Sequence, residues 1–333
     1  MEKKIPTSVV VPVYNEADFL KKCLAALMGQ ESAEFGKDYE VIVVDDGSTD
    51  ASVSIARNYP VRLVQFSENK GKIRAREAGA QAANFSHILF VDARVEVGRD
   101  ILRRCWEIGY SPLLSGRQLD LENKDMDPAE RLFFLIRRAY YYPNFPLTPR
   151  NKALTIDTHN FTRAPKGTTC LFIRKDLFLE AIPKTYDKYS NDDSALLEYI
   201  VFQKKVNLVR HYDVAITYAH RTQPAQLSRW VVRRGVTFFD FYLRKSALRS
   251  IFFIFMPLLV AGAVLTFSFL YSMKIFAFFL FAALLAYIFL MLFLIQSPRD
   301  IPLVFFGCAK YAACFYFGMA KGWVVRRRSG LRR

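Results

Sequence analysis

The stretch YEVIVVDDGSTD, residues 39–50, has the pattern that decides the fold. Its β-branched run, Val41 to Val44, is apolar at every position, which is typical of a strand covered on both faces. Two carboxylates, Asp45 and Asp46, follow at the carboxyl end of this run. A short Gly-Ser segment then leads into a stretch with helical character. The hexapeptide DDGSTD taken alone is equally typical of a turn and a helix cap.

The same order of strand, polar residues and helix recurs through the first hundred residues. Apolar runs predict strands at 8–14, 41–44, 61–66 and 86–91, and the segments between them predict helices at 16–30, 51–59 and 72–84. Continuous Val and Ile runs separated by helices favour a mostly parallel sheet with both faces covered. The sequence therefore predicts an α/β domain of Rossmann-like type.

Polar side chains gather where three of these strands end. They are Asn15, Glu16, Asp45, Asp46 and Asp92. Ligands of open parallel sheets bind at the carboxyl ends of the strands. Acid and amide groups at three such ends indicate a polyhydroxylated, phosphorylated ligand such as a nucleotide sugar.

Four segments in this order resemble the family 2 glycosyltransferases, which have a GT-A nucleotide-sugar-binding domain. They are VVPVYNE (10–16), VVDDGSTD (43–50), NKGKIRAREAG (69–79) and FVDAR (90–94). The resemblance runs from about Ser8 to Trp230 and is strongest over the first hundred residues. It implies transfer of a sugar from a UDP- or GDP-sugar donor.

The resemblance also implies the donor-binding residues. The nucleotide pocket would be lined by Pro12, Tyr14, Asn15 and Glu16. Asp46 would contact the base or ribose, with Asp45 beside it. The nucleotide would also lie close to Asn69, Gly71 and Arg76. The neighbouring Lys70 and Lys72 are interpreted as solvated charges.

FVDAR departs from the D-x-D motif of the resembled family. Asp92 matches the first carboxylate, but Arg94 stands where the second is expected. Three explanations are open. Glu96, on the same side of an extended strand, could supply the missing carboxylate; Arg94 could itself neutralise the diphosphate; or Arg94 could pair with Asp92 in an inactive site. We favour Mg²⁺ or Mn²⁺ held through Asp92 with help from another acid or from the diphosphate.

The segment YSNDDSALLEYIV, residues 189–201, is the candidate for the catalytic base. An inverting transfer needs a carboxylate to take the proton of the acceptor hydroxyl. Helix capping by these acids is the competing interpretation. The resemblance places the base at the second acid, Asp193, with Asp192 in support. It also places Gly167, Thr168 and Thr169 near donor or acceptor.

QLSRW, residues 226–230, matches the Q-x-x-R-W motif of the processive members of the resembled family. The motif residues are Gln226, Arg229 and Trp230. The resemblance implies that Arg229 meets the leaving diphosphate and that Trp230 contacts the acceptor sugar. Trp230 as an interfacial anchor is the alternative. Residues 121–131 predict a polar loop. The aromatic, Pro-rich segment 137–152 has no clear periodicity, and it could either stack on sugar rings or form a surface loop that folds back on the domain.

The C-terminal third is strongly apolar. Residues 251–296 contain Lys274 as their single charged residue, which predicts a transmembrane helical hairpin. The stretch 301–325 carries Lys310 and Lys321 on nearly the same helix face, which favours a helix lying in the interface. Arginine clusters on both sides of the hairpin place the first domain in the cytoplasm.

The amino-acid composition indicates which kind of partner the protein binds. The net charge of +16 indicates anionic lipid headgroups rather than nucleic acid, because the chain has no nucleic-acid recognition motif. The five cysteines form no CxxC pair and are interpreted as reduced packing thiols.

Together these features predict four segments. They are a cytoplasmic GT-A catalytic domain (1–225), a basic juxtamembrane segment (226–250), the hairpin (251–296), and an interfacial helix with a basic tail (297–333). The predicted function is an inverting glycosyltransferase at the cell inner membrane, acting on a lipid-linked or glycan acceptor. A polyprenyl-phosphate sugar synthase, a non-catalytic nucleotide-sugar sensor, and a membrane transport or scaffold protein are the alternatives.

Overall fold

The computed structural model describes residues 4–119, 128–183, 192–219, 224–238, 273–295 and 297–328, together with 262, 263 and 266. The chain divides into two compact units. The first comprises Met1–Met126 and Tyr141–His220, and the second comprises Asp127–Tyr140 and Arg221–Arg333. The sequence places 127–140 in the catalytic domain, whereas in the structure this segment groups with the C-terminal unit.

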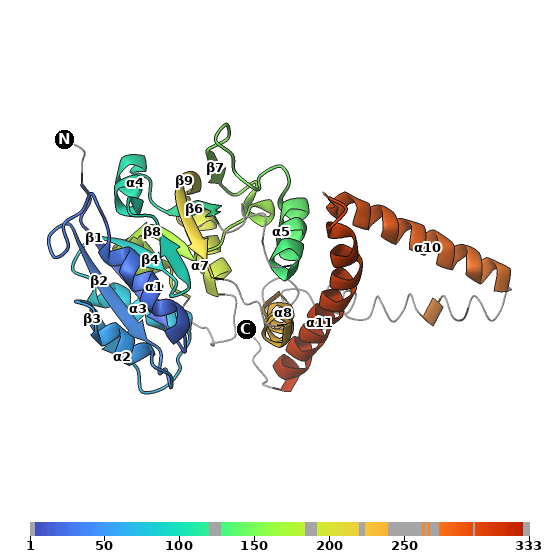
Figure 1. Ribbon diagram of the computed structural model, residues 1–333, viewed down its shortest axis with the longest axis horizontal. Coiled ribbons are helices and arrows are strands. Elements are labelled where there is room, and N and C mark those ends of the chain that lie inside the picture. The colour runs from blue at the N-terminus through green and yellow to red at the C-terminus, as the bar shows by residue number, and fades with distance from the viewer. Residues whose placement is uncertain are drawn as a thin grey trace. The chain divides into compact units, whose positions relative to one another are not determined.

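The first unit is built on a mixed β-sheet (Figure 1). Its strands are β1 (Thr7–Val13), β2 (Tyr39–Asp45), β3 (Arg62–Gln65), β4 (His87–Val91), β5 (Val95–Val97), β6 (Leu113–Gln118), β7 (Ala153–Ile156), β8 (Cys170–Arg174) and β9 (Leu208–Tyr218). Among the described residues the strand order is β3-β2-β1-β4-β8-β6-β9-β5, and β7 pairs with β9.

The expectation of a mostly parallel sheet holds for one half only. Strands β3, β2, β1 and β4 pair in parallel, but β8 runs antiparallel to β4 and to β6, and β9 runs antiparallel to β5 and β7. Parallel neighbours require a crossover connection, usually a helix. The strict alternation of strand and helix ends after the first hundred residues, so the later strands pair in both directions.

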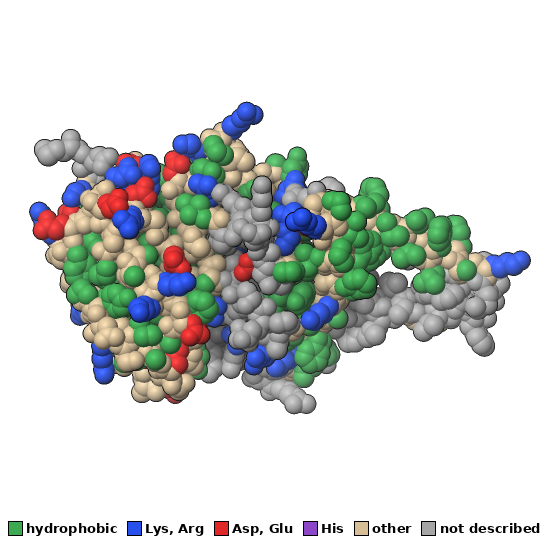
Figure 2. All heavy atoms as spheres, in the orientation of Figure 1, with side chains coloured by type: hydrophobic (Ala, Val, Ile, Leu, Met, Phe, Trp, Pro, Cys, Tyr) green, Lys and Arg blue, Asp and Glu red, His purple; other side chains and the backbone are tan. Residues whose placement is uncertain are grey.

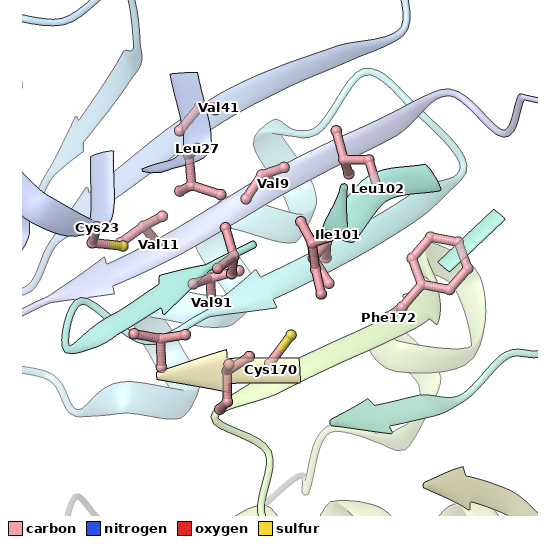
Figure 3. Packing of buried hydrophobic residues seen from close by; sticks show 14 of the residues in the cluster. Val9, Val11, Cys23, Leu27, Val41, Val91, Ile101, Leu102, Cys170 and Phe172 are labelled. Atoms are coloured by element: carbon pink, nitrogen blue, oxygen red, sulfur yellow. The ribbon is translucent and has the colours of Figure 1, made fainter. Parts of the chain in front are cut away.

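Helices cover both faces of this sheet, as the sequence predicts. They are α1 (Ala17–Met28), α2 (Ser52–Arg57), α3 (Lys72–Ala82), α4 (Ile101–Ile108), α6 (Lys175–Ala181) and α7 (Asp192–Phe202), with a 3₁₀ turn at Phe161–Arg163. Alternate residues of β1 face opposite cores. Val9 and Val11 pack with Leu27 of α1, as Figure 3 shows, whereas Val10 packs with Ile73 of α3.

Three of the cysteines belong to the core of the first unit. Cys23, Cys105 and Cys170 are fully buried free thiols. Burial raises the pKa of each of these thiols, because a thiolate would lose its hydration. They stay protonated and pack as small apolar side chains, which confirms the interpretation from the sequence.

Gly79 allows α3 to lie directly on the sheet. A Cβ at this position would overlap Val10 Cγ1 and would lie 3.1 Å from Val44 Cγ2. The absence of a side chain therefore sets the distance between α3 and strands β1 and β2. This distance matters because α3 carries Arg76, whose side chain reaches across the end of the sheet.

We expect Gly79→Ala to destabilise the protein by about 1–3 kcal/mol, the usual cost of overpacking a core. Alanine favours a helix by about 1 kcal/mol over glycine, so the clash must outweigh that gain. Urea denaturation followed by circular dichroism measures the difference. Gly29→Ala is the control, since its Cβ would meet only backbone oxygens, at 3.4 Å and beyond. Equal stability of the two variants would contradict the packing argument.

The second unit consists of helices α5 (Pro128–Tyr141), α8 (Pro224–Phe238), α10 (Met273–Leu294) and α11 (Asp300–Arg328). The sequence predicted a polar loop at 121–131 and an aperiodic aromatic segment at 137–152. These predictions were wrong at the two ends of α5, 128–131 and 137–141. α5 packs along α11 through an ion pair between Arg131 and Asp300 and a ring contact between Phe133 and Tyr311. Arg131 Nε donates to Asp300 Oδ1 at 3.0 Å and its terminal nitrogen to Oδ2 at 3.1 Å.

Helices α8 and α11 cross at two glycines. A Cβ on Gly235 would overlap the backbone oxygen of Phe315, and one on Gly318 would overlap that of Val232. Leu227 and Val231 of α8 are buried, while Arg229, Arg233 and Arg234 are exposed. α8 is therefore an amphipathic helix with an arginine-rich outer face.

Within the described residues, one helix is long and apolar enough to cross a membrane by length and composition, over Asp300–Val324. Hydrophobic side chains along α10 and α11 are visible in Figure 2, and the most exposed of them include Phe289 and Phe306. Helix α10 coincides with the second half of the predicted hairpin. Nearly all of its first half lies outside the described residues, so the hairpin stays a prediction. Lys310 and Lys321 are both exposed on α11.

Candidate functional site

The loops that follow β1 and β2 are tied to each other. The Asn15 side chain accepts a hydrogen bond from the Thr49 backbone at 2.8 Å, and the Asn15 backbone donates to Ser48 Oγ at 3.0 Å. Asn15 has a positive φ of 52°, a conformation that asparagine tolerates better than most residues. Asp45, buried, accepts from the Ser48 backbone at 3.3 Å. The YNE and DDGSTD segments thus form one rigid rim at the carboxyl end of the sheet.

Asp46 fixes the start of α3. Its carboxylate is 3% exposed and accepts hydrogen bonds from the backbone of Lys70 at 2.7 Å and of Gly71 at 2.9 Å. Gly71 has a φ of 96°, which only glycine adopts without strain. Asp46 therefore positions the NKGK segment against the sheet. Its predicted contact with a base or ribose stays a prediction.

Arg76 is the centre of the site. This guanidinium lies on the buried face of α3 with 1% of the residue exposed, and its charge lies over the Phe90 ring. One terminal nitrogen donates to Asp193 Oδ1 at 3.0 Å and to Thr168 Oγ1 at 2.9 Å. The other donates to Asp92 Oδ1 at 3.0 Å and to the Thr168 backbone oxygen at 2.6 Å.

Arg76 thus joins three predicted site segments that are far apart in the chain. Asp92 follows β4, Thr168 precedes β8, and Asp193 lies in the first turn of α7. The fork of the guanidinium suits this role because it presents several donors in a fixed plane. The proposed base, Asp193, and the D-x-D carboxylate, Asp92, are therefore held on one group.

Lys72 completes this cluster, which we call the Arg76 cluster (Arg76, Lys72, Asp92, Asp193 and Thr168). Its ammonium lies 3.0 Å from Asp92 Oδ2 and 3.6 Å from Asp193 Oδ2. The interpretation of Lys72 as a solvated charge was wrong, because the residue pairs with both carboxylates. The interpretation holds for Lys70, which is exposed with its ammonium over the Phe66 ring.

Arg94 is paired with Glu16, not with Asp92. Its Nε lies 2.8 Å from Glu16 Oε1 and a terminal nitrogen lies 2.7 Å from Oε2. The guanidinium also lies over the Phe19 ring at 4.2 Å and donates to the Ala219 backbone oxygen at 3.4 Å. Glu16 and Phe19 belong to the beginning of α1, so Arg94 connects that helix to the turn after β4. The inactive Asp92–Arg94 pair considered from the sequence is thereby excluded.

The site lacks the second acid of a D-x-D metal centre, because Arg94 stands in its place. The described residues contain no group of three or more His, Cys, Asp or Glu side chains placed to hold a metal ion. Both oxygens of Asp92 already accept from cations, and the position of the second acid is occupied by a paired arginine. Glu96 lies half-buried on β5 opposite Thr217. Metal binding through Asp92 and Glu96 stays a prediction, and the proposed transfer step does not depend on it.

The structure describes the side chains of only some of the other predicted site residues. The side chains of Asp192, Gln226 and Trp230 lie outside the described residues. Arg229 is exposed on α8 of the second unit. Tyr14 is 45% exposed at the end of β1, and Pro12 is half-buried within that strand.

The strand order of the sheet shows the fold class of the first unit. The parallel strands β3-β2-β1-β4 and the antiparallel strands beyond them form a GT-A-like mixed sheet. The mannosyltransferase PcManGT from Pyrobaculum calidifontis, solved in complex with GDP-Man and Mn²⁺, has a similar fold. It aligns with a TM-score of 0.61 and 17% identity over 96% of this chain and 88% of that one.

Residues 8–108 match the model of glycosyl transferase family 2. A dolichyl-phosphate beta-glucosyltransferase of Drosophila melanogaster is 41% identical over 97 residues, 26% of this chain and 30% of that protein. A poly(ribitol-phosphate) beta-glucosyltransferase of Bacillus spizizenii is 37% identical over 103 residues, 29% of this chain and 16% of that protein. The match spans less than a third of either curated relative.

We expect Arg76→Met to destabilise the protein by about 2–4 kcal/mol, because it leaves two carboxylates facing each other without their buried partner. Partial exposure of both carboxylates keeps the cost below that of a fully buried pair. Chemical denaturation measures it. Arg74→Met on the same helix is the control, since Arg74 is exposed and pairs with Glu77 at the surface, and the change should cost less than about 0.5 kcal/mol. Equal losses for the two variants would show that Arg76 does not hold the cluster together.

Proposed function

We propose that this protein is an inverting glycosyltransferase that moves a sugar from a nucleoside-diphosphate donor to a lipid-linked acceptor. The observation that carries the proposal is the Arg76 cluster. It holds a D-x-D-type carboxylate and a candidate general base on one guanidinium, at the ligand-binding end of a family 2 domain. General acid–base chemistry needs a carboxylate in a fixed position, and this arrangement supports that requirement.

The transfer step follows from the chemistry of the donor. The acceptor hydroxyl oxygen attacks the anomeric carbon of the donor sugar, and Asp193 takes the hydroxyl proton. The bond between the anomeric carbon and the diphosphate oxygen breaks, and the nucleoside diphosphate leaves with the bonding electrons. Arg76 fixes the orientation of Asp193, while Asp46 and Asn15 shape the nucleotide side of the pocket through the loops they hold.

The second unit supports a lipid-linked acceptor. Helix α11 has the length and composition of a membrane-crossing helix, and α8 carries an exposed arginine face. Such a surface suits a bilayer with anionic headgroups. The names of the two curated relatives contain different acceptors, dolichyl phosphate and poly(ribitol phosphate), so the names alone favour neither kind. We assign the site to the cytoplasmic face of the inner membrane, with Arg229 and Trp230 serving diphosphate and acceptor as the sequence predicts.

A non-catalytic nucleotide-sugar sensor is the second candidate, and it is favoured by the replacement of the second D-x-D acid by Arg94. It requires donor binding without turnover. A polyprenyl-phosphate sugar synthase would share the chemistry above and would differ only in its acceptor. A measurement of turnover distinguishes an enzyme from the nucleotide-sugar sensor. Identification of the glycosylated product distinguishes a polyprenyl-phosphate sugar synthase from a transferase with another acceptor.

We expect the full-length chain to release nucleoside diphosphate from at least one sugar of a UDP- and GDP-sugar panel when membrane lipid extract is present. Asp193→Asn removes the proton acceptor and should lower the rate about 10²-fold or more, with donor affinity within about threefold of the parent. Coupled nucleotide-release kinetics measure the rate, and equilibrium binding measures the affinity.

Asp176→Asn is the matched control. Asp176 is an exposed acid that pairs with Arg174 at the start of α6, and its substitution should leave the rate unchanged. Donor binding without release from any sugar, by the parent chain with extract, would favour the sensor and contradict the enzyme.

A further inference from the structure

Of the two cations in the Arg76 cluster, Lys72 is the one that solvent reaches. Its side chain is 40% exposed, whereas that of Arg76 is 2% exposed. The two cations contact different atoms of the same carboxylates. Arg76 binds Oδ1 of Asp92 and of Asp193, and Lys72 faces Oδ2 of each. The cation that an anionic ligand can reach from solvent is therefore the Lys72 ammonium, which lies beside the 37% exposed side chain of Asp193.

The charges of the cluster leave a donor diphosphate in need of a cation. Asp92 and Asp193 are both held by the buried Arg76, and Lys72 is a second cation that the two acids share. A diphosphate brought beside them adds further negative charge that must be neutralised. In a D-x-D site a divalent ion held by two acids supplies this charge. Here the second acid is replaced by Arg94, and its guanidinium is engaged by Glu16 and the Phe19 ring.

The backbone around Lys72 suits an anion. Lys72 is the first residue of the eleven-residue helix α3, whose N-terminal dipole also favours negative charge. Asp46 holds the preceding loop in place through the backbone of Lys70 and Gly71. The lysine ammonium is a compact charge on a flexible stem, so it can turn from a carboxylate to a phosphate without movement of the helix.

We propose that Lys72 binds the diphosphate of the donor and supplies the charge that a divalent ion supplies in a D-x-D site. Nucleoside diphosphate binding to this protein is then independent of divalent metal. The inference rests on the proposed function, since it assigns a binding role within the same site. Donor binding draws the ammonium from the carboxylates to the phosphate oxygens, which removes it from Asp193 Oδ2 as the acceptor arrives.

The test is equilibrium binding of UDP and of GDP to the purified full-length chain, by calorimetry, in EDTA and in MnCl₂. The parent chain should bind one of the two nucleotides with dissociation constants that agree within about threefold between the two buffers. Lys72→Met should weaken binding in EDTA by about tenfold or more, the size of a lost charge-assisted contact. Lys72→Arg, which keeps the charge, should stay within about threefold of the parent.

Lys70→Met is the matched control. It lies two residues away, removes the same charge and is exposed over the Phe66 ring, so binding should not change. The exposure of Lys72 makes both of its variants compatible with folding, and their melting temperatures verify this. Metal-independent binding by the parent and by Lys72→Arg carries the inference should Lys72→Met fail to fold.

Two results would overturn the role of Lys72 while leaving the proposed function intact. One is binding by the parent chain that disappears in EDTA and returns with Mn²⁺. The other is binding by Lys72→Met that equals the parent in EDTA. Failure of the parent chain to bind either nucleotide in both buffers contradicts the proposed function itself.

Discussion

The buried guanidinium of Arg76 is the interaction on which the site depends. It carries a positive charge into the protein interior, where an unpaired charge would cost several kcal/mol. Asp92, Asp193 and Thr168 offset that cost, and they come from three separate segments of the chain. The requirement to satisfy one buried cation thus brings together the residues that we propose for glycosyl transfer.

The packing of α3 makes this possible. Gly79 lets the helix lie against β1, and Asp46 fixes the loop that precedes the helix. The first turns of α3 are therefore held in place, and the side chains of Arg76 and Lys72 lie over the end of the sheet. Arg94 has a related structural role on the other side of β4. By binding Glu16 and covering Phe19 it holds the beginning of α1. The residue that departs from the family motif is therefore built into the rim of the pocket.

The first half of the fold follows from the sequence because its signals are local. Continuous apolar strands and amphipathic helices alternate there, and the acids at strand ends mark the ligand-binding edge. The mixed half was not predicted, since strand direction beyond α4 depends on tertiary pairing. The sequence does contain features that are typical of a helix at α5. Pro128 stands at its first position and Glu130 in its first turn, and the buried Leu132 and Leu135 are three residues apart.

The site was predictable as a set of motifs but not as a network. Arg76 falls on the same helix face as Ile73 and Ala80, and an arginine among core positions requires an acidic partner. Which acids these are, and that Lys72 joins them, depends on tertiary contacts, and those to Asp193 span more than a hundred residues of the chain. The most direct test of the account is the anomeric configuration of the transferred sugar, read by NMR of the product formed from an accepted donor. Inversion relative to the donor is the predicted result, and a retained configuration would contradict Asp193 as the base of a single displacement.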